Sequence, residues 1–322
     1  MSAKPLAVSV GDPAGIGPEV TVSALAGLHE EEAFVVFGDA ARLEARFREA
    51  GVPTGPAEEA AAGKVGLAPT ARWSDATIAA HAPTPEGGRA QLEALDAAID
   101  AVRRGRARAL VTGPTSKEAI VLGGTPFTGQ TERLARRCGL GDDDVTMMFL
   151  GPRLKVGLVT THLSVRDAAA AITPARVSRA VRHLLEALER LSEDGGPTIW
   201  VTGVNPHAGE GGLFGDEEER AVAPALAAWA DDERVWGPIP AEAAFRAAAE
   251  GRVDGVVAML HDQATIASKL LDWGAAVNVT WGLPFVRTSV DHGVAYDAAR
   301  QGTASAAGME AAVALARRLV PE

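Results

Sequence analysis

The sequence predicts an α/β protein built on a largely parallel sheet, and two observations carry this prediction. Short apolar runs of strand length alternate with longer segments of helical spacing, the order typical of a parallel sheet. Turns rich in glycine and proline follow several of these runs, as they do where a strand leads into a helix. With 322 residues, 47% hydrophobic and 23% charged, the chain has the composition of an ordinary globular protein and the length for one large domain or two.

The first third of the chain supplies strands and helices in this alternation. Residues 6–10 form an apolar run that predicts a buried strand, and the run breaks at Gly11 into a glycine-rich turn. Pro18 is well placed in the first turn of a following helix. Residues 51–87 have weak periodicity and receive no assignment. The other elements expected here are strands at 33–37 and 109–112 and helices at 40–50 and 91–104.

The rest of the chain continues the pattern. Residues 174–191 carry apolar side chains at helical spacing and predict a strongly amphipathic helix. No internal repeat or low-complexity linker interrupts the alternation. The other elements expected here are strands near 145–150, 155–160, 198–202 and 255–259 and helices at 241–249 and 304–319.

Charge and cysteine content exclude several classes of protein. The formal net charge of −11 argues against a nucleic-acid-binding protein, because phosphate contacts need a basic surface, but it leaves room for an anionic small substrate. Cys138 is the single cysteine, so no disulfide forms within the chain and a reducing cytosol is the simplest compartment. No apolar run has the length of a membrane span or a secretion signal. We therefore expect a cytoplasmic protein that does not bind membranes.

The turn at residues 11–19, Gly-Asp-Pro-Ala-Gly-Ile-Gly-Pro-Glu, has two interpretations. Its backbone N–H groups can face an anion at the start of the following helix. Alternatively, glycine is there to supply the positive φ of a tight turn. The spacing does not match the Gly-x-Gly-x-x-Gly fingerprint of dinucleotide-binding folds. The sequence leaves both interpretations open.

Several polar residues are candidates for holding a phosphate or a carboxylate. Arg287 offers two parallel hydrogen bonds, Lys269 a point charge and Asn278 neutral donors. Alternatively, these residues are ordinary polar side chains in solvent. This interpretation suits Arg287 least, because Arg287 directly follows an apolar run. A predicted helix also opens at Gln130, where Thr131 can cap it and create a donor-rich start.

Three histidines share a position just beyond a predicted strand, where α/β sheets present ligands. They are His162, His207 and His261. Neutral imidazoles from separate strand ends suit Zn²⁺ or a similar divalent ion, whereas a lone histidine there is more often a hydrogen-bonded structural residue. We interpret the three together as a metal-ligand set. The interpretation of His29, His81 and His183 is that they lie at the surface or cap helices.

Five segments spread over nearly the whole chain resemble the 4-hydroxythreonine-4-phosphate dehydrogenase family of pyridoxal phosphate biosynthesis. This family is in turn similar in fold to isocitrate and isopropylmalate dehydrogenases. Their Gly-Asp-Gly-Ile-Gly-Pro-Glu turn and His-Gly-Ser-Ala-Pro-Asp cofactor loop resemble residues 11–19 and 292–297. The five segments are residues 11–19, 111–114, 205–210, 261–263 and 282–293.

The resemblance implies two α/β domains of the isocitrate/isopropylmalate dehydrogenase-like type with a cleft between them. Residues 1–125 plus 272–322 would form the cofactor-binding domain, and residues 126–271 the metal, substrate and dimerisation domain. It further implies a homodimer with shared active sites, NAD or NADP as cofactor, and one divalent ion (Zn, Mg or Co) per site. The implied reaction oxidises 4-hydroxy-L-threonine 4-phosphate at C3 and then removes CO₂, which gives 3-amino-1-hydroxyacetone 1-phosphate.

The resemblance also implies a role for individual residues. The metal would be held by His162, His207 and His261. Asp262, beside a metal ligand, would transfer protons, and Lys269 would be catalytic and bind substrate. The remaining implied residues are Gln130, Thr131, Asn278 and Arg287 for the substrate and His292, Gly293 and Asp297 for the cofactor.

Three departures from the family pattern bear on the substrate and the cofactor. Gln130 stands where the family usually has histidine, and Glu242 where it has aspartate. Arg300 replaces the usual glycine after the cofactor loop and either favours a 2′-phosphate or lies in solvent. An alternative function is therefore a dehydrogenase of threonate or erythronate 4-phosphate. From another class, a phosphate acyltransferase of related fold needs neither metal nor nicotinamide and leaves the three histidines unexplained.

Overall fold

The computed structural model describes residues 4–192 and 196–321, and it confirms the predicted α/β class. The chain forms two compact units. Unit 1 consists of the residues up to Leu140 together with Leu283–Val320, and unit 2 of Gly141–Gly282. The changes of unit thus fall 15 and 11 residues later than the domain boundaries expected after residues 125 and 271. No helix among the described residues has the length and apolar character needed to cross a membrane.

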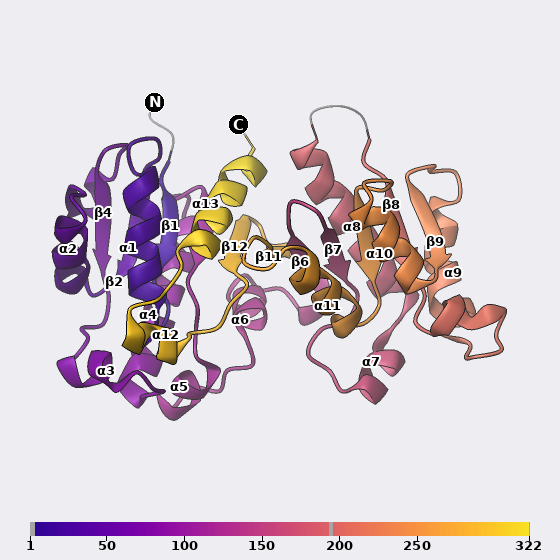
Figure 1. Ribbon diagram of the computed structural model, residues 1–322, viewed down its shortest axis with the longest axis horizontal. Helices are drawn as coiled ribbons and strands as arrows, with labels where there is room; N and C mark the ends of the chain where they lie inside the picture. The colour runs from indigo at the N-terminus through magenta and orange to yellow at the C-terminus, as the bar shows by residue number, and fades with distance from the viewer. Residues whose placement is uncertain (1–3, 193–195, 322) are drawn as a thin grey trace. The chain divides into compact units, whose positions relative to one another are not determined.

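Unit 1 alternates strand and helix through its N-terminal part and is completed by the C-terminal segment (Figure 1). Its elements are β1 (Leu6–Ser9), α1 (Gly17–Leu28), β2 (Phe34–Gly38), α2 (Ala40–Glu49), β3 (Thr54–Pro56), η1 (Ala57–Glu59), β4 (Val65–Pro69), α3 (Asp75–Ala80), α4 (Pro85–Arg103), β5 (Ala109–Thr112), α5 (Lys117–Leu122), α6 (Gln130–Arg137), β12 (Val286–Val290), α12 (Tyr296–Gln301) and α13 (Ala307–Leu319).

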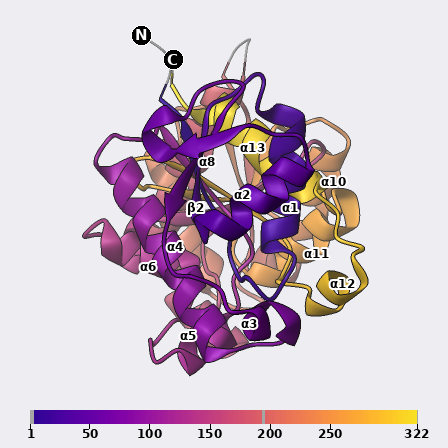
Figure 2. The same cartoon turned by 90° about the vertical axis from the view of Figure 1, so that its left-hand side faces the viewer.

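The strands of unit 1 lie in the order β3-β4-β2-β1-β5-β12 and all pair in parallel. In Figure 2, β2 lies between α4 on one side and α1 on the other. Apolar side chains of α4, among them Leu95 and Ile99, form the core with strand residues such as Val35 and Leu110. Because all these strands run the same way, their carboxyl ends meet at one edge, where β1, β5 and β12 lead into the segments with the candidate residues.

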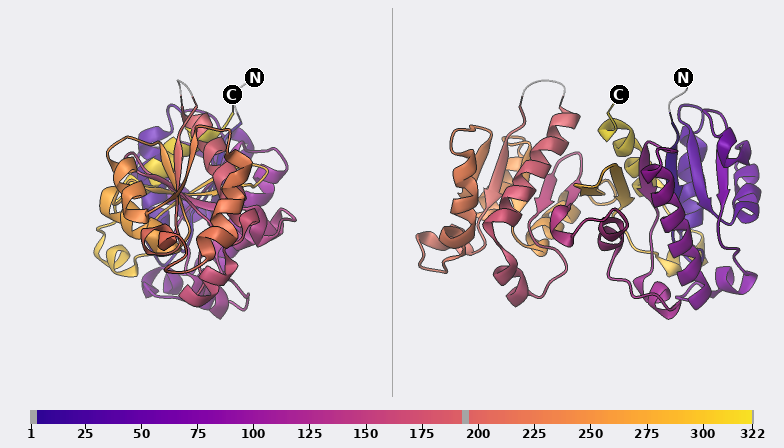
Figure 3. Two further views of the ribbon diagram at one scale, coloured as in Figure 1. Left: turned by 90° about the vertical axis from the view of Figure 1, so that its right-hand side faces the viewer. Right: turned by 180° about the vertical axis from the view of Figure 1, so that it is seen from behind.

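Unit 2 also combines strands and helices (Figure 3). These are η2 (Asp142–Asp144), β6 (Thr146–Leu150), β7 (Lys155–Leu158), α7 (Val165–Ala171), α8 (Pro174–Leu191), β8 (Ile199–Thr202), η3 (Pro206–Glu210), the π-helical η4 (Glu218–Val222), α9 (Ala223–Leu226), η5 (Ala227–Trp229), β9 (Val235–Ile239), α10 (Ala241–Ala249), β10 (Gly255–Ala258), α11 (His261–Leu271) and β11 (Val277–Trp281).

The strands of unit 2 lie in the order β11-β6-β7-β10-β8-β9. β7, β10, β8 and β9 are parallel, whereas β6 is antiparallel to both of its neighbours. Met147 and Val156 pack with α10 residues such as Ala244 and Ala247 in the core. β7, β8 and β10 are adjacent, so the chain leaves three neighbouring strands at one edge, and each of the three histidines follows one of them.

Two helices have the bounds that the sequence predicts, and a third begins earlier than predicted. α8 and α10 cover the predicted residues 174–191 and 241–249. α4 begins six residues before the predicted start at residue 91, because the Thr84 hydroxyl accepts a hydrogen bond from the N–H of Gly87 and Pro85 occupies the first turn. The unassigned stretch 51–87 contains short elements, β3, β4 and α3.

Candidate functional site

Arg287 lies in β12 of unit 1 with its guanidinium almost completely buried. The residue is 3% exposed. Its Nη2 donates to the hydroxyl of Thr112 at 2.8 Å and to Gln130 Oε1 at 2.6 Å. Burial lowers the pKa of Arg287 to about 9, and the Glu132 carboxylate opposes that shift. The guanidinium remains positively charged at neutral pH and forms a fixed cation inside unit 1.

Gln130, the first residue of α6, connects Arg287 to the turn after β5. Its Oε1 accepts from Arg287, and its Nε2 donates to the carbonyl of Gly113 at 3.1 Å and to the hydroxyl of Thr115 at 3.0 Å. Both amide hydrogens and one acceptor position are thus used within unit 1. The half-buried Thr131 follows it in the first turn of α6. The structure therefore brings Arg287 and Gln130 together, with Thr131 next to Gln130 in the first turn of α6 and the Glu132 carboxylate near enough to act on the Arg287 charge.

The segment after β12 carries the residues expected to bind a cofactor. His292 Nδ1 is 3.0 Å from the carbonyl of Gly293, and its Nε2 is buried without a hydrogen-bond partner among the described residues. A Cβ added to Gly293 would meet no atom within 4 Å. The carboxylate of Asp297, in the first turn of α12, is exposed and lies 3.8 Å from Arg300. The open space at Gly293 and the exposed carboxylate of Asp297 are features that a nucleotide can use, whereas Nε2 of His292 faces Gly308 of α13.

The three histidines all lie in unit 2, each beyond the strand that the sequence predicts. The ring centroids of His162 and His261 are 5.5 Å apart with the rings tilted at 47°. His207 lies in η3, where it has a positive φ of 54° and its ring packs 6.5 Å from that of Phe214. Within residues 4–192 and 196–321, no three His, Cys, Asp or Glu side chains are close enough to form a metal-binding group. The structure thus brings two of the three candidate ligands together.

Asp262 contacts one of these ligands. His261 begins α11, and its Nδ1 lies 2.8 Å from Asp262 Oδ1. An imidazole held through Nδ1 directs Nε2 outward, and a carboxylate in this position commonly orients a metal-binding histidine. The side chain of Asp262 is 82% exposed. Its geometry favours orienting His261, in addition to the proton transfer expected from the sequence.

Two side chains that the sequence analysis did not single out hold the strand ends in place. Gln263 Oε1 accepts from the N–H groups of Met259 and Leu260 at 3.1 and 3.0 Å, and its Nε2 donates to the carbonyl of Gly203 at 3.1 Å. It therefore joins the end of β10 to the end of β8. Glu218 accepts from the N–H of Val204 at 2.7 Å and fixes the segment that leads to η3. The His-Asp-Gln motif was a visible signal for Gln263, but nothing local marks Glu218.

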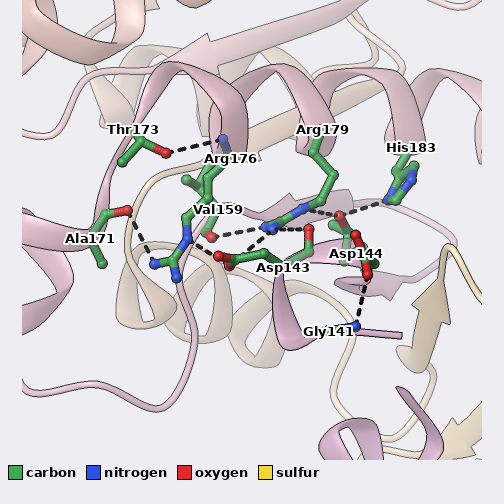
Figure 4. Close-up of polar contacts among 10 residues, drawn as sticks. Gly141, Asp143, Asp144, Val159, Ala171, Thr173, Arg176, Arg179 and His183 are labelled. Atoms are coloured by element: carbon green, nitrogen blue, oxygen red, sulfur yellow. Dashed lines mark hydrogen bonds and ion pairs between the residues drawn. The ribbon is translucent and has the colours of Figure 1, made fainter. Parts of the chain in front are cut away.

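Arg179 is a third such residue, and it holds the end of β7. Figure 4 shows its side chain reaching from α8 to the carbonyls of Asp143 and Val159. Nη1 donates to the carbonyl of Asp143 at 2.9 Å and Nη2 to that of Val159 at 3.2 Å. Burial lowers the pKa of Arg179. Val159 lies three residues before His162, so Arg179 stabilises the path of the chain toward that ligand.

His183 corrects one interpretation of the sequence. We expected it at the surface or in a cap, but it is 5% exposed, and its Nδ1 lies 2.9 Å from the hydroxyl of Thr146. Burial lowers its pKa to about 4. Its place in α8 turns it toward β6, which periodicity alone did not distinguish from the polar face. His29 and His81 follow the ends of α1 and α3, as expected for capping residues.

The other two substrate candidates lie in unit 2. Lys269 is in the last turn of α11, with Nζ 5.6 Å from the ring centroid of Trp273. Asn278 is half-buried in β11, opposite Phe149 of β6. Both are in different elements from Arg287 and Gln130, so the substrate-binding residues expected from the sequence are divided between the two units.

Comparisons with known proteins agree on one family. A family model described as Pyridoxal phosphate biosynthetic protein PdxA matches residues 30–316. A 4-hydroxythreonine-4-phosphate dehydrogenase from Chromobacterium violaceum is 42% identical over 321 residues, which cover 98% of this chain and 96% of the relative. A Cutibacterium acnes protein, provisionally named D-threonate 4-phosphate dehydrogenase, is 38% identical over 330 residues, or 98% of this chain and 94% of the relative.

Solved structures give the same result. The crystal structure of 4-hydroxythreonine-4-phosphate dehydrogenase from Klebsiella pneumoniae matches with a TM-score of 0.82 and 36% identity, and covers 99% of this chain and 100% of that one. A branched-chain phosphotransacylase from Enterococcus faecalis matches with a TM-score of 0.56 at 14% identity over 98% of this chain and 100% of that one, which shows a shared fold alone.

Proposed function

The chain belongs to the PdxA family of pyridoxal phosphate biosynthetic proteins and is an oxidoreductase, and from this we propose that it oxidises a phosphorylated hydroxy acid with NAD(P) and a divalent metal. The proposed substrate is 4-hydroxy-L-threonine 4-phosphate, oxidised at C3 and then decarboxylated to 3-amino-1-hydroxyacetone 1-phosphate. The relatives' names support the substrate. The residues described above support the assignment of its parts to particular side chains.

The observation that carries this proposal is the buried cation in unit 1. Arg287 is held by Thr112 and Gln130, and the Glu132 carboxylate acts on its charge. A buried guanidinium is stable only with hydrogen-bond acceptors around it, and a phosphate monoester supplies several strong ones. We therefore assign the substrate phosphate to Arg287 and Thr131, with Gln130 beside them.

The donor set in unit 2 fits a divalent ion in part. His162 and His261 lie close enough to bind a shared ion, and Asp262 leaves Nε2 of His261 available. We propose His207 as the third ligand, which requires its ring to move toward the other two. A bound divalent ion would act as a Lewis acid on the substrate hydroxyl and on the carbonyl formed from it.

The remaining residues hold the substrate and the cofactor. Lys269 donates to the substrate carboxylate through its ammonium group, and Asn278 supplies neutral donors. Asp262 accepts a proton within reach of His261. His292, Gly293 and Asp297 form the nicotinamide cofactor site, and NAD or NADP bound there supplies the hydride acceptor. Arg300 lies close enough to Asp297 to counter its charge, so cofactor preference depends on that pair.

We also propose a cytoplasmic homodimer formed through unit 2. Ile266 and Leu270 lie on α11 and Trp273 lies two residues beyond its end, and the three are 60%, 80% and 80% exposed. Large apolar side chains grouped on and just after one helix are typical of a surface that another protein covers. The same helix carries His261 and Lys269, so a second copy of the chain on this face would lie beside residues assigned to the site.

A second candidate substrate is a four-carbon sugar acid such as threonate or erythronate 4-phosphate. The name of the Cutibacterium acnes relative, a D-threonate 4-phosphate dehydrogenase, favours it. The sugar acid has a hydroxyl at C2 in place of the amino group. The phosphate site in unit 1 serves either substrate, so the choice depends on the groups that contact C2.

One assay separates these candidates. Formation of NADH and NADPH is followed with 4-hydroxythreonine 4-phosphate and with D-threonate and D-erythronate 4-phosphate, before and after chelation and metal restoration. We expect turnover that is lost on chelation and restored by Zn²⁺, Mg²⁺ or Co²⁺. Turnover that survives complete metal removal would contradict the metal assignment. The absence of NADH and NADPH with all three substrates would contradict the proposed function.

A further inference from the structure

The glycine-rich turn after β1 contains three glycines and one aspartate. None of these residues has an assigned role in the proposed reaction. Gly11 has a positive φ of 81°, and a Cβ there would lie 2.1 Å from the carbonyl oxygen of Pro114. A Cβ on Gly17 would lie 2.1 Å from the carbonyl oxygen of Val10. These two glycines are needed because backbone from the same unit approaches them too closely for any side chain.

Gly15 is needed for a different contact. A Cβ there would lie 2.1 Å from Val294 Cγ1 and 2.6 Å from the Val294 carbonyl oxygen. The N–H of Ile16 donates to that same carbonyl at 3.0 Å. Val294 is buried, although Gly293 before it and Ala295 after it are exposed. The segment after β12 thus rests directly on the glycine-rich turn.

Asp12 connects the same two segments through its side chain. It is 0% exposed. Its Oδ2 accepts from the Tyr296 hydroxyl at 2.8 Å and from Gln91 Nε2 at 3.0 Å, and its Oδ1 accepts from the N–H of Ala14 at 2.9 Å. Gln91 Oε1 in turn accepts from the N–H of Ser116 at 2.8 Å. One buried carboxylate therefore joins β1, α4, α5 and the start of α12 through named hydrogen bonds.

Tyr296 is the single tyrosine of the chain and lies at the first position of α12. The residue before it, Ala295, has a positive φ of 47°, a conformation that a non-glycine residue adopts only when its surroundings hold it. The Asp12–Tyr296 bond on one side and the Val294–Ile16 bond on the other supply that restraint. Asp297, assigned to the cofactor, is the next residue.

We propose that the Gly11–Gly17 turn is the surface on which the 292–297 segment packs. Asp12 and Tyr296 are a positioning pair that holds this segment in the conformation that binds the nicotinamide cofactor. The inference rests on the proposed function for the identity of the cofactor. It gives the turn a purpose other than binding a phosphate itself. Neither Asp12 nor Tyr296 needs to touch the cofactor, because they act through His292, Gly293 and Asp297.

The test uses Tyr296→Phe, Asp12→Asn and the double variant in the full-length protein. Tyr296→Phe removes one hydroxyl and preserves the ring. Asp12→Asn places an amide donor where two donors already point. Thr288→Val is the matched control, since it removes a buried hydroxyl of unit 1 that lies outside the segment. That hydroxyl donates to the carbonyl of Ala312 at 2.8 Å.

Two readouts are taken on each variant. Amide hydrogen exchange over residues 291–303 reports the order of the segment with no ligand added, and titration with NAD⁺, NADP⁺ and NADH by protein fluorescence gives cofactor affinity. We expect exchange in this segment to rise about tenfold and the dinucleotide Kd to rise about tenfold in either single variant, with no further loss in the double variant. Metal affinity and the KM for the phosphorylated substrate stay within about twofold, and Thr288→Val changes neither readout at this segment.

Unchanged exchange in both single variants would overturn the positioning role. Raised exchange with an unchanged dinucleotide Kd would overturn the link to the cofactor. Additive effects in the double variant would show that Asp12 and Tyr296 act separately and overturn the pair. If the unaltered protein binds neither NAD nor NADP, the proposed function fails, whereas the exchange measurement still decides whether the turn holds the segment.

Discussion

The cation site of unit 1 and the histidine set of unit 2 differ in how their polar groups are held. Arg287 is 3% exposed and is fixed by Thr112 and Gln130. In unit 2 the side chain of His261 is 33% exposed and that of Asp262 82% exposed, while His207 lies in a segment with positive φ values. One site is a buried charge with internal partners, and the other is a set of accessible groups on strand ends.

This difference fits the chemistry proposed for each site. A buried cation must have acceptors at all times, because an unpaired charge in the interior is strongly destabilising. A metal-binding histidine must instead keep one ring nitrogen accessible to the ion. Its ring is therefore oriented by a hydrogen bond to the other nitrogen. Variants of the Arg287 site are therefore expected to alter substrate binding most, and variants of the histidine set to alter metal affinity.

The largest effect is expected from Arg287→Lys. Lysine keeps the charge but loses the planar guanidinium, which can donate to a phosphate through two nitrogens at once. We expect kcat/KM for the phosphorylated substrate to fall about a thousandfold, with metal affinity unchanged. Steady-state kinetics and metal titration measure this. Arg42→Lys, in the exposed pair with Asp75, is the matched control and should stay within about twofold. An Arg287→Lys enzyme with unaltered KM would remove Arg287 from the phosphate site.

The next effect separates the accessible histidines from the buried one. His261→Ala removes a proposed ligand beside His162 and should weaken Zn²⁺ binding at least a hundredfold. His183→Ala also removes an imidazole from unit 2, but this imidazole is buried and hydrogen-bonds Thr146. It should lower thermal stability and leave Zn²⁺ affinity unchanged. Metal titration monitored by competition with a chelating dye decides between them, and equal loss of affinity in both would contradict the distinction.

A smaller effect is expected from Asp262→Asn, which tests how His261 is oriented. The contact between Asp262 Oδ1 and His261 Nδ1 stabilises the tautomer with Nε2 open, so its loss should weaken metal binding about tenfold. A purely proton-transferring Asp262 would give a different result, with reduced kcat and unchanged metal affinity. Measuring both quantities on the same preparation separates the two roles. Asp167→Asn, at an exposed carboxylate that accepts a hydrogen bond from the Ser164 hydroxyl at the start of α7, serves as the control.

The sequence predicted the parts of this molecule that depend on local pattern. Alternating strands and helices gave the α/β class, and the histidines after β7, β8 and β10 share one edge because those strands are adjacent and parallel. Arg287 directly follows an apolar run in the sequence, and in the structure Arg287 is buried. These features need only periodicity and the direction of parallel strands.

The parts that the sequence could not predict depend on contacts between distant residues. Arg179 holds Val159, 20 residues away, and Tyr296 donates to Asp12, 284 residues away. The role of Gly15 follows from the approach of Val294, which no local motif records. The hydrogen bonds of Gln130 were likewise invisible, so the sequence could only assign it to the substrate and not to Arg287.

The smallest expected effect concerns the buried His183. It is a change in the free energy of unfolding with pH. Burial holds the pKa of His183 at about 4 in the folded protein, whereas an unfolded histidine titrates near 6.5. Because the unfolded state then binds the additional proton, stability is complete above about pH 6.5 and falls as the pH approaches 4. Between pH 7 and pH 5.5 this amounts to about 1 kcal/mol of unfolding free energy. Urea unfolding at both pH values measures the loss, and His183→Gln, which can still hydrogen-bond Thr146, should show a loss smaller by that amount. An identical pH dependence in the variant would mean that His183 is accessible to protons in the folded state, like the histidines at the strand ends.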